Sequence, residues 1–160
     1  MATRKVLVMT TGQIEQIQAG DTIQADIAEV DLIEMNNGNA GTINICQTVY
    51  VDGVDSVDLA QADAEATMDV VGFVKDATIA TGVDGMIQTD GILAATTGQW
   101  DAVTSDTGGL TAGTVYYLDA STPGSITDTA PITVGQYVVQ LGRAISTTEM
   151  EISISDPILL

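Results

Sequence analysis

The segment Glu149-Met150-Glu151-Ile152-Ser153-Ile154-Ser155 places an apolar side chain at every second position. Successive side chains of a β-strand point to opposite faces, so this alternation predicts a strand with one buried face and one face in water. Residues 23–27 and 30–32 repeat the pattern earlier in the chain. The alternation therefore favours a fold built from half-buried strands.

Two longer apolar runs predict strands that are covered on both faces. They are Val70-Val71-Gly72-Phe73-Val74 and Gln136-Tyr137-Val138-Val139-Gln140-Leu141. Between such runs lie residues that tolerate positive φ or form tight turns. These predicted turns are Asn37-Gly38, Asp52-Gly53, Asp84-Gly85, Asp90-Gly91 and Thr122-Pro123-Gly124.

These patterns predict a mainly β protein, either a β-sandwich or a small β-barrel, with at most one or two short helices. The first helical candidate is 59–68, which is rich in alanine and follows Asp58 as an N-cap. The second is 97–103, which follows a threonine cap and contains Trp100.

The first 45 residues differ from the rest in composition and end in the loose sequence 36–41. We predict that 1–45 forms an extended N-terminal arm or outer strands, and that 46–160 forms a compact β domain. The alternative, that 1–45 supplies the first strands of one single domain, carries equal weight. A further hypothesis is an internal duplication, because 48–93 and 114–159 both begin with Thr-Val-Tyr and both end in Ile-Leu.

The charge of the chain argues against several classes of partner. It has 22 acidic and 4 basic residues, which gives a net charge of −18. Nucleic acids and anionic membrane surfaces both require a basic footprint, so we expect neither as a partner. The apolar run 6–9 is too short for a signal peptide or a membrane span. We therefore expect a protein that is made inside the cell.

The residue types that are absent narrow the chemistry further. The chain has no histidine and one cysteine, and it contains no P-loop and no GxGxxG motif. Imidazole ligands, histidine bases and an intrachain disulfide are thereby excluded. A thiol without a histidine lacks its usual activating partner, so Cys46 is interpreted as a small buried apolar residue. We predict no enzyme activity, no catalytic residue, no cofactor and no metal.

Three candidate sites have to be weighed against simpler interpretations. An acidic run could bind calcium, although its spacing does not fit an EF-hand and a solvated loop is the favoured interpretation. Paired carboxylates could hydrolyse a glycosidic bond, but outward-facing strand residues explain them better. Aromatic rings could bind sugars, but packing is the commoner role. The groups are Asp52, Asp55, Asp58, Asp63, Glu65 and Asp69 for calcium, Glu149 with Glu151 or Asp84 with Asp90 for hydrolysis, and Trp100, Tyr116, Tyr117 and Tyr137 for sugar.

The two ends of the chain hold the candidate partner contacts. Arg4 and Lys5 form its main basic spot and could bind an acidic neighbour, although ordinary solubilising charge is an equal alternative. The other two basic residues, Lys75 and Arg143, lie near the ends of the two long apolar runs and could each neutralise a nearby carboxylate. The run Pro157-Ile158-Leu159-Leu160 is an uncharged apolar tail, which we expect to dock on its own core or on a partner.

The chain resembles small virion proteins of tailed bacteriophages, namely capsid decoration (cement) proteins and head-fibre-like proteins. The resemblance lies in the opening 1–8 with 19–23, in 49–53 with 59–62, in 108–118 with 122–124, and in the ending 142–152 with 157–160. Similar segments occur in phage tail-fibre and appendage proteins, so they indicate the virion more firmly than a location on it.

The resemblance implies a β-rich module, often trimeric, that binds the major capsid protein on the capsid surface and stabilises the head. It also implies that the N-terminal arm, with Arg4, Lys5, Val6 and Val8, extends a neighbour's sheet. The alternatives are a head- or tail-fibre subunit that contacts the host surface and, less favoured, a calcium-dependent carbohydrate-binding module. An enzyme that degrades glycans or peptidoglycan is the weakest, because only carboxylates are available.

Overall fold

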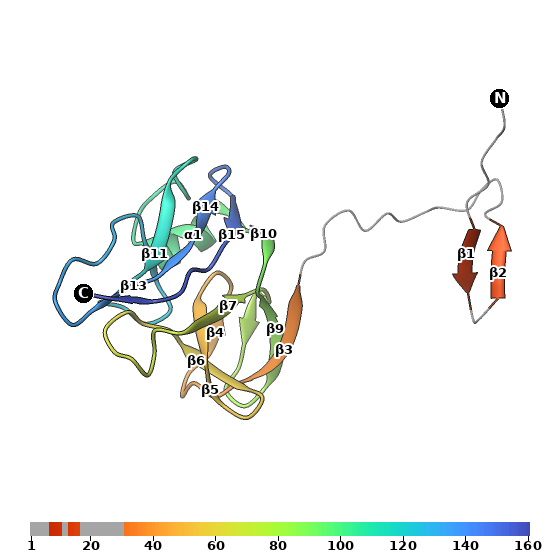
Figure 1. Cartoon of the computed structure of the whole chain (residues 1–160), viewed down its shortest axis with the longest axis horizontal. Helices are drawn as coiled ribbons and strands as arrows, with labels where there is room; N and C mark the ends of the chain where they lie inside the picture. The colour runs from red at the N-terminus through yellow and green to blue at the C-terminus, as the bar shows by residue number, and fades with distance from the viewer. Residues whose placement is uncertain (1–6, 11–12, 17–30) are drawn as a thin grey trace.

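The computed structural model describes residues 7–10, 13–16 and 31–160, and β-strands dominate it (Figure 1). Its two main parts are a closed five-stranded barrel and a separate five-stranded sheet. The prediction of a mainly β fold, either a sandwich or a small barrel, is thus confirmed, and the barrel is the architecture present. One helix occurs within the described residues, in agreement with the prediction of at most one or two short helices.

The barrel has the strand order β3-β6-β5-β7-β9. It closes through β3, which pairs in parallel with β6 and antiparallel with β9. Its interior is filled by aliphatic side chains, among them Ile43, Val49, Val57, Val74 and Ile87. The strands are β3 (Leu32–Asn37), β5 (Thr48–Gly53), β6 (Ser56–Leu59), β7 (Val70–Val74) and β9 (Asp84–Gln88).

The second sheet is antiparallel throughout, with the order β10-β15-β14-β11-β12. In β15, Met150 and Ile152 are buried while Glu151 is exposed, so the alternation seen in the sequence sets the two faces of this strand. The strands are β10 (Gly91–Ala94), β11 (Val115–Leu118), β12 (Ile126–Thr127), β14 (Gln140–Ala144) and β15 (Glu149–Ile152).

Six short strands form three antiparallel pairs. The pairs are β1 (Leu7–Thr10) with β2 (Gln13–Gln16), β4 (Ile43–Asn44) with β8 (Thr78–Ile79), and β13 (Tyr137–Val138) with β16 (Ile158–Leu159). The long run 136–141 is therefore two strands, β13 and β14, and Val139 between them is buried in the core. This corrects the prediction of one continuous strand.

The helix α1 (Thr97–Thr104) agrees closely with the predicted helix 97–103. Thr96 caps it, because its hydroxyl accepts from the Gln99 amide while the Gln99 side chain accepts from the Thr96 amide. The helix buries Trp100 and Val103, which pack into the main core.

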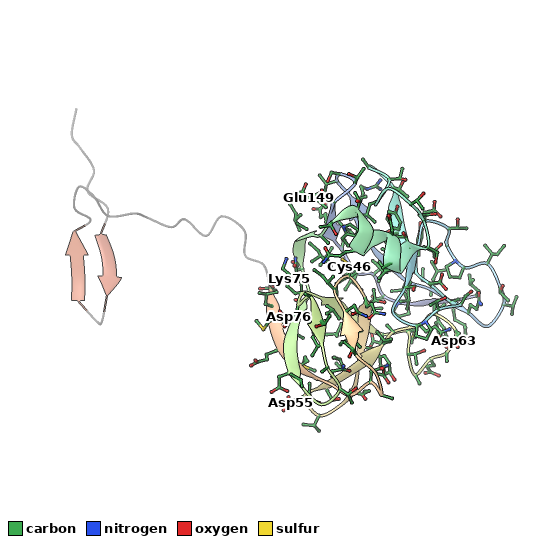
Figure 2. The ribbon with its side chains drawn as sticks, turned by 180° about the vertical axis from the view of Figure 1, so that it is seen from behind. Cys46, Asp55, Asp63, Lys75, Asp76 and Glu149 are labelled. Atoms are coloured by element: carbon green, nitrogen blue, oxygen red, sulfur yellow. The ribbon has the colours of Figure 1, made fainter. Side chains whose placement is uncertain are left out.

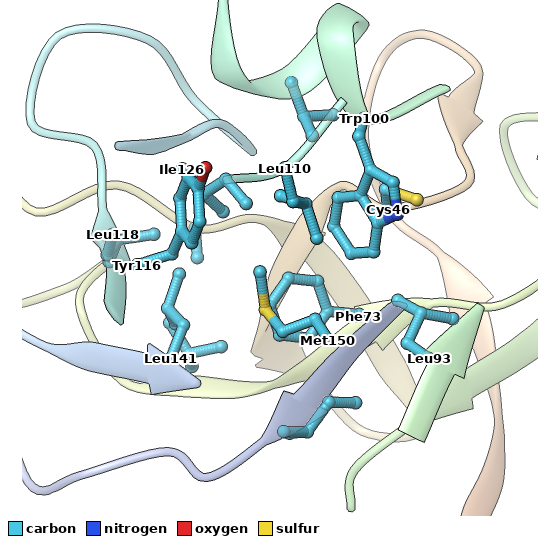
Figure 3. Packing of buried hydrophobic residues seen from close by; sticks show 14 of the residues in the cluster. Cys46, Phe73, Leu93, Trp100, Leu110, Tyr116, Leu118, Ile126, Leu141 and Met150 are labelled. Carbon is cyan, nitrogen blue, oxygen red and sulfur yellow. The ribbon is translucent and has the colours of Figure 1, made fainter. Parts of the chain in front are cut away.

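The main core lies between the barrel and the second sheet (Figure 3). Phe73 of β7 and Cys46 reach it from the barrel side, while Trp100, Leu141 and Met150 reach it from the helix and the sheet. The barrel and the sheet therefore share one apolar core in addition to the interior of the barrel.

The predicted helix 59–68 is absent, and this prediction is wrong. Leu59 ends β6, and the amides that follow donate to distant carbonyls, Ala60 to Thr48 and Ala62 to Asp119. Asp58 caps no helix, because its carboxylate accepts from its neighbour Leu59. Alanine is favoured here because small side chains fit the buried positions 60 and 62, not because the segment is helical.

Glycine-containing turns are confirmed in part. The Thr122 carbonyl accepts from Ser125, and Gly124 has φ 75°, as a type II turn with Pro123 at its second position requires. Gly85, in contrast, lies inside β9, where a Cβ atom would overlap the side chain of Ile79. The predicted turn at Asp84-Gly85 is therefore wrong, and close packing explains this glycine.

Two predictions on domain organisation, the division into 1–45 and 46–160 and the internal duplication, stay predictions. The strands β3 and β4 precede residue 46 and belong to the barrel and its flanking pair, and β10 from the first proposed repeat pairs with β15 from the second. The proposed arm before residue 31 lies largely outside the described residues, apart from the backbone of β1 and β2.

Candidate functional site: an apolar face beside strand β16

Large exposed apolar side chains gather on the loop 129–136 and on the neighbouring chain end. Ile132 is 89% exposed and Val134 is 88% exposed, whereas Ile158, Leu159 and Leu160 are 62%, 61% and 38% exposed. We call these five residues the apolar face. Single exposed apolar residues are ordinary, whereas a group of this kind is a candidate contact surface.

Backbone hydrogen bonds hold the two segments of the apolar face together. Tyr137 pairs with Leu159 and Val138 with Ile158, and the Leu160 amide donates to the Gln136 carbonyl at 3.0 Å. The Gly135 amide then donates to the Leu160 carbonyl at 3.0 Å, which fixes the end of the loop beside β16. Figure 1 shows the C-terminus lying beside this loop at one side of the molecule. Because successive side chains of a strand point to opposite sides, Ile158 and Leu159 cover both sides of β16, and the apolar face extends around the edge of this strand pair.

The apolar face is free of charged side chains in a strongly acidic protein. No acidic or basic residue occurs in 129–142 or in 157–160, although the whole chain carries a net charge of −18. Desolvation of carboxylates is costly, so an uncharged surface is the part of this molecule that another protein can cover most easily.

The predicted partner contacts are brought together only in part. Ile158, Leu159 and Leu160 lie on the apolar face, with Pro157 beside them. Val8 lies in β1, of which the backbone is described, while Arg4, Lys5 and Val6 lie outside the described residues.

Sequence reasoning missed Ile132 and Val134. The signal that would have found them is an uncharged run after Pro131 in which apolar residues alternate with threonine, without the continuous apolar character of a core strand.

The acidic run does not form a metal site in the part of the chain that the structure describes. No group of three or more His, Cys, Asp or Glu side chains in those residues could hold a metal ion. Figure 2 shows Asp55 and Asp63 well apart on the molecule. Glu65 and Asp69 instead border an open depression of about 400 Å³ beside Tyr50. Burial, and then the carboxylates of Asp58 and Asp52, raise the pKa of Tyr50.

The carboxylate pairs that were considered for hydrolysis make contacts with the strands and turns around them. Glu149 and Glu151 share the face of β15 opposite Met150, as predicted, and Ser146 donates to Glu149. Asp84 accepts from the Asn36 side chain, and Asp90 accepts from the Gly91 amide in the turn before β10. Each of these last two groups therefore stabilises a local strand or turn.

The aromatic side chains do not form an exposed platform. Trp100 and Tyr116 are 0% and 1% exposed, and each uses its polar atom inside the fold. The Trp100 indole donates to the Thr148 carbonyl at 3.1 Å, and the Tyr116 hydroxyl accepts from the Thr111 amide at 3.0 Å. These two rings are core residues, so the carbohydrate platform containing them is wrong.

Cys46 is buried, as the sequence predicts. Burial raises the pKa of its thiol to about 12, and the nearby Lys75 charge lowers it only in part. A thiol with such a pKa is protonated at neutral pH and is a poor nucleophile. Its role is to fill space where the barrel meets the main core.

The two basic residues within 31–160 occupy different positions. Lys75 follows β7 and lies close enough to Cys46 to influence its pKa. Arg143 stands opposite Glu151 across β14 and β15, and its guanidinium donates to the Gly113 carbonyl. Neither residue belongs to the apolar face.

The chain matches no protein-family model, and no curated protein matches it. Among the described residues, no helix is both long enough and apolar enough to cross a membrane.

Proposed function

We propose that this chain is a structural virion protein, a capsid decoration protein that binds the major capsid protein lattice and stabilises the head. In this role it has no catalytic activity and needs no cofactor. It is made in the host cytoplasm and becomes part of the capsid surface. The observation that carries the proposal is the apolar face, an apolar surface without charged side chains on an acidic protein.

The rest of the structure is consistent with a role in binding. A barrel and a sheet that share one core give a rigid support, on which β16 and the loop before β13 present the exposed side chains. The charge of −18 keeps unassembled copies apart and soluble, and it disfavours contact with the packaged genome. Lattice binding needs shape and apolar contact, and the apolar face offers both.

The direct test is binding of the purified protein to capsids that lack it. We expect saturable binding at a fixed ratio to the major capsid protein, together with greater resistance of the capsid to heat. The double variant Ile158→Ser/Leu159→Ser should lose binding at least tenfold and keep its circular dichroism spectrum. The matched control is Val54→Ser, which removes a side chain that is 94% exposed in the β5–β6 turn, and it should bind normally.

Other outcomes would assign a different role. If the protein fails to bind capsids but is retained on host cells, the fibre-subunit alternative replaces the decoration proposal. If calcium raises its melting temperature and it is retained on polysaccharide, a carbohydrate-binding module replaces it. The mass in solution, measured alongside, tests the trimer that the resemblance implies.

A further inference from the structure

We infer that the surface covered by the apolar face belongs to a different protein and is apolar with a border of lysine or arginine side chains. This inference rests on the proposed function and specifies the partner of the same site. It is drawn from the charges that surround the face.

Three exposed carboxylates border the apolar face. Asp156 immediately precedes Pro157 and β16, and Asp128 begins the loop that carries Ile132. Asp63 follows Ala62, whose carbonyl accepts from the amide of Tyr137 in β13 at 2.9 Å, so its backbone lies beside the β13–β16 pair. The face therefore has an apolar centre and a negative border.

No cation within residues 31–160 neutralises this border. The two basic residues of that part of the chain are Lys75 and Arg143. Figure 2 shows Lys75 on the side of the molecule opposite Asp63. Arg143 donates its guanidinium to the Gly113 carbonyl beside β11. Asp63 and Asp128 accept from the hydroxyls of Thr67 and Thr129, but neither has a basic partner within residues 31–160.

This arrangement disfavours a second copy of the chain as the occupant. If two apolar faces met, each border of Asp63, Asp128 and Asp156 would come close to the same border of the other copy, and both copies carry a net charge of −18. Like charges that are brought together at such an interface repel one another over a screening length of about 8 Å at physiological salt. A surface with cations around an apolar centre matches the apolar face in both respects.

The test compares two triple variants with the same change in net charge. The border variant is Asp63→Asn/Asp128→Asn/Asp156→Asn, and the control variant is Asp52→Asn/Asp55→Asn/Asp106→Asn, which alters exposed residues away from the face. The association rate and the affinity for capsids lacking the protein are measured from 50 to 300 mM NaCl. Exposed charge pairs are each worth about 1.5- to 5-fold in affinity, so the border variant, which loses three carboxylates, should bind about 3- to 125-fold more weakly at low salt. It should also lose most of its salt dependence.

Each result decides the inference. A selective effect of the border variant supports it, whereas equal effects of the two variants would show that only net charge matters and would overturn it. Doubling of the solution mass of the wild-type protein, with loss of that doubling in Ile158→Ser/Leu159→Ser, would identify a second copy as the occupant and overturn it too. If the wild-type protein does not bind capsids, both the proposed function and this inference are wrong. If the wild-type protein binds capsids and the two triple variants have equal effects, only this inference is wrong.

Discussion

The ring of Phe73 meets the ring of Trp100 edge to face, with centroids 6.4 Å apart and planes inclined by 74°. Phe73 belongs to barrel strand β7 and Trp100 to helix α1, and both side chains are fully buried. This pair therefore joins the barrel to the part of the molecule that contains the second sheet (Figure 3). Aromatic pairs in this geometry contribute about 0.5–1.5 kcal/mol beyond the burial of their area.

Loss of either ring should destabilise the whole body. Phe73→Ala and Trp100→Ala should each lower the free energy of unfolding by about 3–5 kcal/mol, because each leaves a cavity in the shared core. Urea unfolding followed by circular dichroism measures this change. Because the barrel and the sheet share this core, we expect them to unfold in one transition. Two separate transitions in the wild-type protein would contradict a shared core.

Removal of the helix cap should cause a smaller and more local loss of stability. Thr96→Ala removes the hydroxyl that accepts from the Gln99 amide and should cost about 1 kcal/mol of unfolding free energy. Thr107→Ala, at an exposed position after the helix, is the control and should change stability by less than about 0.5 kcal/mol. Equal losses in the two variants would show that the cap is not what stabilises α1.

Two glycines should respond in opposite ways to the same substitution. A Cβ atom on Gly142 would overlap the carbonyl oxygen of Glu151 in the adjacent strand, so Gly142→Ala should cost about 1–3 kcal/mol. Gly98 in α1 has no neighbour within 4 Å of such an atom, so Gly98→Ala should leave stability unchanged or raise it by up to about 1 kcal/mol. Thermal unfolding of the two variants side by side tests the close approach of β14 and β15.

The local sequence pattern was sufficient to predict a strand or helix where the buried side chains follow the period of that element. The alternation of 149–152 predicted β15 and its two faces, and the threonine cap before Trp100 predicted α1. It failed where contacts with distant residues decide the conformation. Residues 59–68 have the composition of a helix, but their amides bond to Thr48 and Asp119, which no local pattern reveals.

Only part of the candidate site was predicted from the sequence, because contacts between distant residues also form this site. The apolar end 157–160 is visible in the sequence, but its partner loop with Ile132 and Val134 is brought beside it only by the pairing of β13 with β16. Barrel closure through the parallel pair β3–β6 is likewise a long-range event that periodicity does not encode.

Cys46 should make stability depend on pH in the alkaline range. Burial raises the pKa of its thiol from 9.0 to about 12, so between these values the folded protein holds a proton that the unfolded chain has lost. The free energy of unfolding then falls as pH rises, and the contribution is fully present below about pH 9. Between pH 8 and pH 10 the wild-type protein should lose about 1 kcal/mol more than Cys46→Ala, which keeps the small apolar side chain but has no thiol to ionise. Urea unfolding of both proteins at the two pH values measures the difference, and a thiol reagent at pH 8 should label wild-type Cys46 only after unfolding. Parallel losses in the two proteins, or rapid labelling of the folded one, would show that the thiol is accessible to water and that its pKa is close to 9.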